Sequence, residues 1–334
     1  MSGPVGIVRR KFHVGVERSR VRSYRPPLST FIDPSARLEA DVLGDGSRVL
    51  AYARVAAGAT IGRNCVIHDH AVVIGHVTLE DDVNVHTGAQ VLGSVHVEQG
   101  VTVGAGALVG AGQFDGDASK TVVRRFASIG VNATVLPGVV IGRRAVVEPG
   151  SVVTQNVPAN AIVSGNPATI VSYVDTGSEE APSQLLTTAV LLADISNTRV
   201  RGVTLHGLTH ASDLRGSLTA TEFPTLPFAP RRFFAVYDVP SESVRGAHAH
   251  RECSQFLVCL AGSVSCLVDD GSTREEVKLE TPALGLHIPP MVWGTQWRYT
   301  RDAILLVLAS HPYDPDDYIR DYEEFLDELA MRPR

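Results

Sequence analysis

Aliphatic residues recur at every sixth position through the first half of the chain. The series starts at Leu43 and continues without a gap to Val109, and the residue four positions after each member up to Val103 is small or Val. After an interruption the series resumes at Ile129 and ends at Val153. Its members are Leu43, Val49, Val55, Ile61, Ile67, Val73, Leu79, Val85, Val91, Val97, Val103, Val109, Ile129, Val135, Ile141, Val147 and Val153.

A period of six fits neither the period of an α-helix, about 3.6 residues, nor the alternation of an ordinary strand. It predicts a triangular parallel β-solenoid, in which each hexad supplies one short strand and three hexads complete a coil. From Val109 to Ile129 is 20 residues, or three hexads plus two, so the chain leaves the repeat in between. We place the resulting loop at Gln113–Ser128.

The pattern changes after the repeat. From about Thr198, apolar and polar residues alternate in short runs separated by turns, which predicts a small antiparallel barrel or jelly roll. The predicted strands are Arg232–Val239, Gln255–Leu260, Ser263–Val268, Leu286–Pro289 and Ala303–Leu308, followed by a helix at Asp316–Leu329. We divide the chain into a basic extension (1–31), a β-helix (32–174), a linker (175–198) in which Gln184–Ala193 is suited to a short docking helix, and a barrel (199–334).

The distribution of aromatic residues and glycines predicts different cores for the β-helix and the barrel. Aromatic residues make up 6% of the 334 residues, but only 4 lie in Ile32–Val174 against 13 in Asp175–Arg334. Of the 30 glycines, 18 lie in the first of these two segments. A narrow prism has no room for rings and needs glycine at its corners, whereas a barrel packs around rings.

Charge and cysteine usage exclude several classes of protein. The net charge is −6, although the first 31 residues carry +6, so a broad nucleic-acid-binding face is not expected. No apolar run reaches the length of about 18 residues that a membrane span needs, and no apolar signal stretch opens the chain. The four scattered cysteines, with no C-x-x-C, indicate a cytoplasmic protein. The basic extension is suited to targeting, to phosphate binding or to packing on a neighbouring subunit.

The repeat and its closing segment Val157–Ala168 resemble the hexapeptide-repeat acyltransferases. The resemblance covers about residues 32–172 and implies a left-handed β-helix, a homotrimer, and acetyl-CoA along the late coils between subunits. It also implies that a looped-out segment shapes the active site. The run Ile129–Gly138 is similar to members that acylate amino groups on nucleotide-linked sugars. The residues it implies for acetyl-CoA binding are Gly165, Asn166, Pro167 and Ala168.

The same half departs from this family in two places. Members of this type carry Trp-Asp-Gly near the middle and Thr-Asn-Asp before the loop, whereas the chain has Leu92-Gly93-Ser94 and Val109-Gly110-Ala111-Gly112. Both changes remove polar groups that hold a sugar. An altered or absent transferase activity, with the β-helix kept as a trimerising scaffold, therefore stays open.

Histidines are the candidate bases for acyl transfer, because an amine must lose its proton to attack a thioester. His68 and His86 are one coil of eighteen residues apart, so we expect them to lie one above the other on the same face. We assign them a catalytic role in acyl transfer. Two alternatives remain: histidines at a surface or trimer interface, and a zinc site that takes a third ligand from another subunit.

In the barrel, the chemistry centres on His248 and His250, which are two residues apart and so face the same side of a strand. In metal-binding cupins such a pair is followed by a Glu and later by another His. The chain has Gln255 and Thr295 at these two positions, and a carboxamide is a poor ligand for a divalent ion. We therefore expect a cupin frame with no metal. Two neutral imidazoles are suited to moving a proton between carbons beside a ketone, through an enediol.

Several segments of the barrel resemble the dTDP-4-keto-6-deoxyhexose 3,4-ketoisomerases. The matching segments are Leu214–Leu218, Arg245–His250, Gln255–Leu260, Leu308–Ser310, Tyr313–Asp314 and Asp317–Arg320. The resemblance implies that His248 and His250 transfer the proton, and that Arg215 and Arg245 hold the nucleotide diphosphate, with Gln255 also at the substrate. Some members have a His where Gly294 follows Val292-Trp293, which leaves the stereochemical outcome open.

Both halves together resemble bifunctional ketoisomerase/N-acyltransferases of deoxyamino-sugar synthesis. This resemblance implies dTDP-linked keto- and amino-sugars as substrates, acetyl-CoA as co-substrate, and an aminotransferase that acts between the two steps. A ketoisomerase with a scaffold β-helix and a non-catalytic sugar-nucleotide-binding protein are the alternatives.

Overall fold

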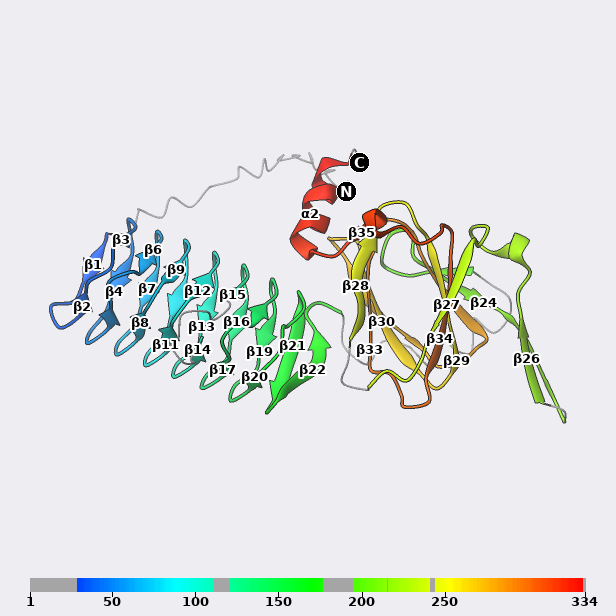
Figure 1. The fold of residues 1–334 in the computed structure, drawn as a ribbon, viewed down its shortest axis with the longest axis horizontal. Helices are drawn as coiled ribbons and strands as arrows, with labels where there is room; N and C mark the ends of the chain where they lie inside the picture. Colours follow the sequence, from blue (N-terminus) through cyan, green and yellow to red (C-terminus); the bar gives the residue numbers. More distant parts are fainter. Residues whose placement is uncertain (1–28, 111–119, 177–194, 215, 241–243, 333–334) are drawn as a thin grey trace, which may run out of the picture.

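A parallel β-helix and a β-barrel follow one another along the chain in the computed structural model (Figure 1). The described residues are 29–110, 120–176, 195–214, 216–240 and 244–332. The basic extension up to residue 28 and the predicted docking helix Gln184–Ala193 lie outside them.

Three sheets form the faces of the β-helix. The first contains β1 (Phe31–Ile32), β4 (Arg48–Val49), β7 (Val66–Ile67), β10 (Asn84–Val85), β13 (Thr102–Val103), β16 (Ser128–Ile129), β19 (Val146–Val147), β21 (Ala161–Gly165) and β22 (Ala168–Tyr173). The second contains β2 (Arg37–Leu38), β5 (Arg54–Val55), β8 (Val72–Ile74), β11 (Gln90–Leu92), β14 (Leu108–Val109), β17 (Thr134–Val135) and β20 (Val152–Val153). The third contains β3 (Val42–Leu43), β6 (Thr60–Ile61), β9 (Val77–Leu79), β12 (Val95–Val97), β15 (Thr121–Val123) and β18 (Val140–Ile141).

The hexad pattern builds the core of this β-helix, as predicted. Val85 pairs with Ile67 below it and Val103 above it, each one coil of eighteen residues away. All members of the series from Val49 to Val153 are at most 1% exposed. Stacked aliphatic side chains and the absence of rings therefore account for the composition of this half.

The predicted loop Gln113–Ser128 is too long. Thr121–Val123 forms β15, and Val97 pairs with Val123, 26 residues away, instead of the usual 18. The coil therefore contains eight extra residues, and the chain is back in the repeat by Thr121. Residues 111–119 lie outside the described part.

Two corner glycines test how tightly the coils stack. Gly75 has a φ of +107°, and a Cβ there would lie 2.5 Å from the carbonyl oxygen of Gly93 on the next coil. Gly88 also has a positive φ, +68°, but a Cβ there would meet nothing within 4 Å.

Gly88→Ala is expected to cost about 1–2 kcal/mol of stability, the cost of a left-handed residue. Gly75→Ala is expected to cost about 2 kcal/mol more, since backbone must also move. Urea unfolding of both variants, followed by circular dichroism, checks this; equal losses would contradict it.

Two larger sheets and a hairpin form the second half. The first sheet contains β23 (Ile195–Asn197), β24 (Thr204–Gly207), β32 (Leu284–Ile288), β29 (Gln255–Ala261), β34 (Ile304–Ala309) and β27 (Arg232–Val236). The second contains β31 (Arg274–Leu279), β30 (Val264–Asp269), β33 (Trp293–Trp297), β28 (Arg245–His250) and β35 (Tyr318–Ile319). The hairpin β25 (Thr209–Asp213) and β26 (Gly216–Ala220) projects from the barrel (Figure 1).

The C-terminal helix is shorter than predicted. Helix α2 spans Tyr322–Met331 instead of Asp316–Leu329, because Pro315–Asp317 forms a 3₁₀ turn and Tyr318–Ile319 joins the sheet as β35. A second 3₁₀ turn spans Phe223–Thr225. No helix in the described ranges is long and apolar enough to cross a membrane.

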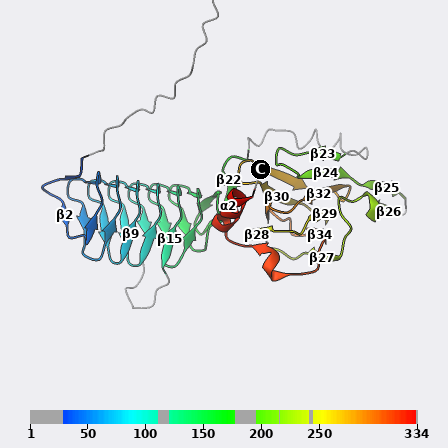
Figure 2. The same ribbon diagram turned by 90° about the horizontal axis from the view of Figure 1, so that it is seen from above.

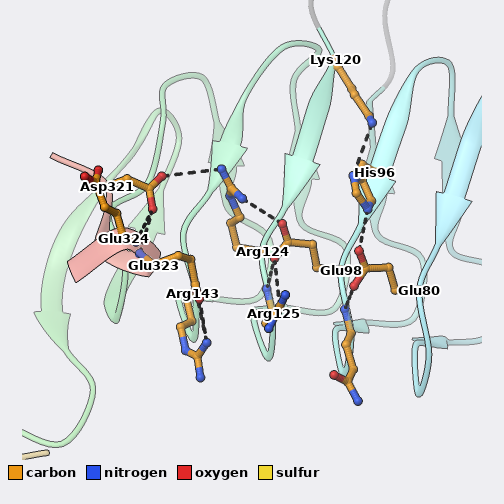
Figure 3. Close-up of polar contacts among 11 residues, drawn as sticks. Glu80, His96, Glu98, Lys120, Arg124, Arg125, Arg143, Asp321, Glu323 and Glu324 are labelled. Atoms are coloured by element: carbon orange, nitrogen blue, oxygen red, sulfur yellow. Dashed lines mark hydrogen bonds and ion pairs between the residues drawn. The ribbon is translucent and has the colours of Figure 1, made fainter. Parts of the chain in front are cut away.

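The barrel covers the C-terminal end of the β-helix (Figures 1 and 2). Trp297 is 2% exposed and packs edge-on against Tyr173, with 5.2 Å between the ring centroids. The Arg274 side chain donates to the carbonyl of Val174 at 2.8 Å. At the start of α2, Glu323 pairs with Arg143 at 3.0 Å (Figure 3). Apolar packing and ion pairs thus join the two halves.

Candidate active site

A bulge in β28 shapes the candidate active site. Gly246 faces Thr295 on β33 and His248 faces Gly294, so Ala247 is an extra residue with no partner. Both Gly246 and Ala247 have positive φ values, 75° and 51°. Because Arg245 faces Gln296, two residues from Gly294, the bulge brings Arg245 to the same face of the sheet as His248. In a regular strand, residues three apart would lie on opposite faces.

The two histidines meet at their Nε2 atoms, 3.2 Å apart. His250 Nδ1 lies 2.6 Å from an oxygen of Asp317, and since a carboxylate only accepts, Nδ1 must carry the proton. The Nε2 of His250 therefore has a lone pair, which also accepts from the Gln255 amide at 3.1 Å. His248 then donates from its own Nε2. The network fixes His250 as the stronger base of the two.

Burial dominates the protonation of this pair. It lowers the pKa of His248 to about 4. It also lowers the pKa of His250, although the hydrogen bond and charge of Asp317 oppose this. Burial raises the pKa of Asp317, but hydrogen bonds from the Glu252 backbone and from His250 outweigh it, and the pKa ends below its ordinary value. At neutral pH the site holds two neutral imidazoles and one carboxylate.

A small cavity opens in front of the histidines, lined by His248, His250, Cys253, Gln255, Ile288, Pro289, Val292, Gly294 and Gln296. Thr295, which the sequence places at the position of a cupin ligand, does not line it. Its neighbours Gly294 and Gln296 do, because alternate residues of β33 face the cavity. The predicted substrate residue Gln255 is in the site, 8% exposed.

One group of three potential metal ligands lies beside the base. Among the described residues, ligand atoms of His250, Cys253 and Asp317 lie within 4.8 Å of one another. A metal there would have to displace the proton that His250 gives to Asp317. The metal-free interpretation stays a prediction.

The two arginines differ in what the structure describes. Arg245 is exposed at the start of β28, on the face of the histidines. Arg215 lies outside the described residues. The Tyr318 ring packs beside His250, with 4.3 Å between the ring centroids, and the guanidinium of Arg320 lies 4.4 Å from the centroid of the Tyr318 ring.

The β-helix holds the other predicted residues. His68 and His86 stack as predicted, with ring centroids 4.7 Å apart and planes 12° apart. Gly165 and Ala168 pair across the turn of the β21–β22 hairpin, with Asn166 and Pro167 between them. These positions are far along the chain from the barrel site, and their roles stay predictions.

Known proteins match both halves. Residues 201–330 match the family model described as FdtA, WxcM-like, C-terminal. Over 119 residues the chain is 42% identical to the TDP-4-oxo-6-deoxy-α-D-glucose-3,4-oxoisomerase of Aneurinibacillus thermoaerophilus, which covers 35% of this chain and 86% of that enzyme. The chain belongs to the 3,4-oxoisomerase family. A crystal structure of a 3,4-ketoisomerase from Helicobacter canadensis is 36% identical, with a TM-score of 0.38, and covers 39% of this chain and 98% of that one.

The β-helix matches a second family model. Residues 42–75 and 120–155 match the bacterial transferase hexapeptide model. Over 55 residues the chain is 47% identical to the dTDP-3-amino-3,6-dideoxy-α-D-galactopyranose 3-N-acetyltransferase of Aneurinibacillus thermoaerophilus, which covers 16% of this chain and 29% of that enzyme. The chain thus joins an oxoisomerase-family barrel to a hexapeptide-repeat β-helix.

Asp317 is the site residue that sequence reasoning did not single out. It lies in a segment, Asp317–Arg320, that carries the resemblance to the oxoisomerase family, but no local spacing connects it to His250, 67 residues earlier. The pairing of β28 with β35, in which His250 faces Tyr318, brings the carboxylate to the imidazole.

Proposed function

We propose that the barrel isomerises TDP-4-keto-6-deoxyglucose to the 3-keto sugar. The observation that carries this proposal is His250, held by Asp317 at Nδ1, with its lone pair at Nε2 beside the cavity and beside His248. His250 takes the proton from the carbon next to the ketone, and Asp317 stabilises the imidazolium that forms. The enediol is then reprotonated at the neighbouring carbon by the histidine pair.

The substrate's diphosphate needs cations at the mouth of this cavity. Arg245 is suited to this task because it is exposed and on the same face as His248. Arg215 is proposed as its partner from the resemblance to the oxoisomerase family. Gln255 contacts His250 directly, so we assign it to holding the base as well as to the substrate. No metal is needed in this scheme, and isomerisation is expected to survive treatment with EDTA.

For the β-helix we propose N-acetylation of a dTDP-3-amino-3,6-dideoxyhexose from acetyl-CoA. The match to the 3-N-acetyltransferase of Aneurinibacillus thermoaerophilus supports it. Acetyl-CoA would lie along the late coils of a homotrimer, at Gly165, Asn166, Pro167 and Ala168. An aminotransferase must act between the two steps, so this protein and the aminotransferase would share the cytoplasm. Joining two activities in one chain raises their local concentration.

Release of free thiol tests the transferase directly. Purified protein with acetyl-CoA and dTDP-3-amino-3,6-dideoxyhexose is expected to release one CoA thiol per amide formed, measured with a thiol reagent. The control is the same sugar nucleotide with a 3-hydroxyl group, which is expected to release none. An isomerase-active preparation that releases no thiol would contradict acetylation and favour a β-helix that serves only as a scaffold.

A further inference from the structure

A second histidine–carboxylate pair lies on the third face of the β-helix. His96, in the middle of β12, has its Nε2 2.9 Å from one oxygen of Glu80. The other oxygen of Glu80 accepts the backbone N–H of Gln99 at 3.1 Å. Both carboxylate oxygens are therefore held, and the imidazole is oriented (Figure 3). Since a carboxylate only accepts, His96 carries its proton at Nε2 and a lone pair at Nδ1.

That lone pair already faces an alkylammonium. Nζ of Lys120 lies 3.3 Å from Nδ1 of His96 (Figure 3). A protonated amino sugar would have to present its nitrogen to a base in this same way. Lys120 directly precedes β15, where the chain returns from its eight-residue excursion, and His96 pairs with Val122 of that strand. The pair thus lies at the one coil that departs from the repeat within residues 42–110 and 120–153.

His68 and His86 offer a different arrangement. They follow β7 and β10 at the edge of the first face, and their rings stack on each other. Among the described residues, neither ring has a hydrogen-bonded carboxylate. Burial lowers the pKa of His68, and the charge of Asp69, which favours the imidazolium, does not outweigh it. The arrangement therefore lacks the hydrogen-bonded carboxylate that orients the ring of His96.

We propose that His96 is the general base of acetyl transfer in the β-helix and that Glu80 is its positioning residue. This inference rests on the proposed transferase function and replaces His68 and His86 in that role. The substrate displaces Lys120, and Nδ1 of His96 takes a proton from the ammonium and passes it to solvent. The amine nitrogen then attacks the thioester carbonyl carbon. As the C–S bond breaks, His96 carries a second proton from nitrogen to the thiolate, which gives the amide, the CoA thiol and one proton in water.

The test compares thiol release by His96→Asn with that by His70→Asn, a matched control on the same β-helix. His70 is exposed, its ring stacks on Tyr52, and its positive φ of 58° suits Asn. His96→Asn is expected to lower kcat by at least about 100-fold, within the range of general-base catalysis. Thiol release by His70→Asn is expected to stay within about threefold of that of the parent protein. Glu80→Gln is expected to lower kcat by about tenfold. The KM for the amino sugar is expected to stay within about twofold, because Glu80 acts through His96 and does not contact the substrate. A merely structural role for Glu80 would raise KM along with the loss in kcat.

The isomerase rate of each preparation serves as the folding control, since His96 is remote from the barrel histidines. A His96→Asn variant that keeps more than half of the parent kcat, in a parent that releases thiol, would overturn this inference alone. A parent protein that isomerises its sugar but releases no thiol would overturn the proposed transferase and this inference with it.

Discussion

His250→Asn is expected to lower the isomerase rate by about 10³-fold, within the range for loss of a general base. The variant keeps the size and polarity of the side chain, but Asn has no lone pair of comparable basicity to place beside His248. Exchange of the substrate's proton with deuterium from the solvent measures the effect directly, because the enediol can form only after that proton leaves. Full exchange in His250→Asn would contradict the assignment.

Two further variants distinguish the role of His250 from those of His248 and Asp317, which contact it. His248→Asn is also expected to slow exchange by about 10³-fold, because it removes the Nε2–H that meets His250 at 3.2 Å. Asp317→Asn keeps both imidazoles and removes only the charge behind His250, so its expected loss is smaller, about 10²-fold. A loss in Asp317→Asn equal to that in His250→Asn would point to collapse of the site instead of a weakened base.

Lowering the pH from 6.5 to 4 is expected to destabilise the barrel by several kcal/mol. Burial lowers the pKa of both His248 and His287 to about 4. In the unfolded chain a histidine titrates near 6.5, so between these values the unfolded state binds more protons than the folded state. The stability due to neutral burial is therefore complete above pH 6.5 and is lost as the pH falls toward 4. Each histidine accounts for up to about 3 kcal/mol, and His287, which is partly exposed, for less.

Tryptophan fluorescence isolates this effect, because both tryptophans, Trp293 and Trp297, lie in the barrel. Urea unfolding at pH 7.5 and 4.5 gives the loss of stability for the parent protein and for His287→Gln. The variant is expected to lose about 2 kcal/mol less between the two pH values. His210→Gln, at an exposed position of β25, is the control and should behave like the parent. Identical losses in all three proteins would show that buried histidines do not set the acid sensitivity.

The β-helix was predictable because its core repeats a local rule. Each aliphatic side chain of the series is buried between the coil above and the coil below. A period of six in the sequence therefore places every sixth side chain in the core. The end of the loop was predictable too. Six residues before Ile129 is Val123, which is buried and continues the series, and this signal marks β15.

The catalytic pair was predictable from its spacing, but its surroundings were not. His248 and His250 share a face because they are two residues apart. The bulge at Ala247 adds Arg245 to that face. It depends on a positive φ at Ala247, which an alanine in the sequence does not predict. Asp317 reaches His250 through a strand pairing between distant segments, and Glu80 reaches His96 across neighbouring coils sixteen residues apart. Contacts between residues on different strands can be predicted only when the pairing of those strands is known.

Local signals determine where α2 begins. The predicted helix covers Asp316–Leu329, but Pro315 opens a 3₁₀ turn and Asp321 caps the helix by accepting from two backbone N–H groups. The cap places Tyr318 in a strand beside His250. The shorter helix is therefore what brings Asp317 and Tyr318 into the site.

One incubation tests the central claim most directly. The protein, TDP-4-keto-6-deoxyglucose and D₂O are mixed, and the sugar is followed by NMR. The structure predicts a 3-keto-6-deoxy sugar with deuterium at the carbon that was the ketone. Recovery of the unchanged 4-keto sugar without deuterium would contradict the isomerase function.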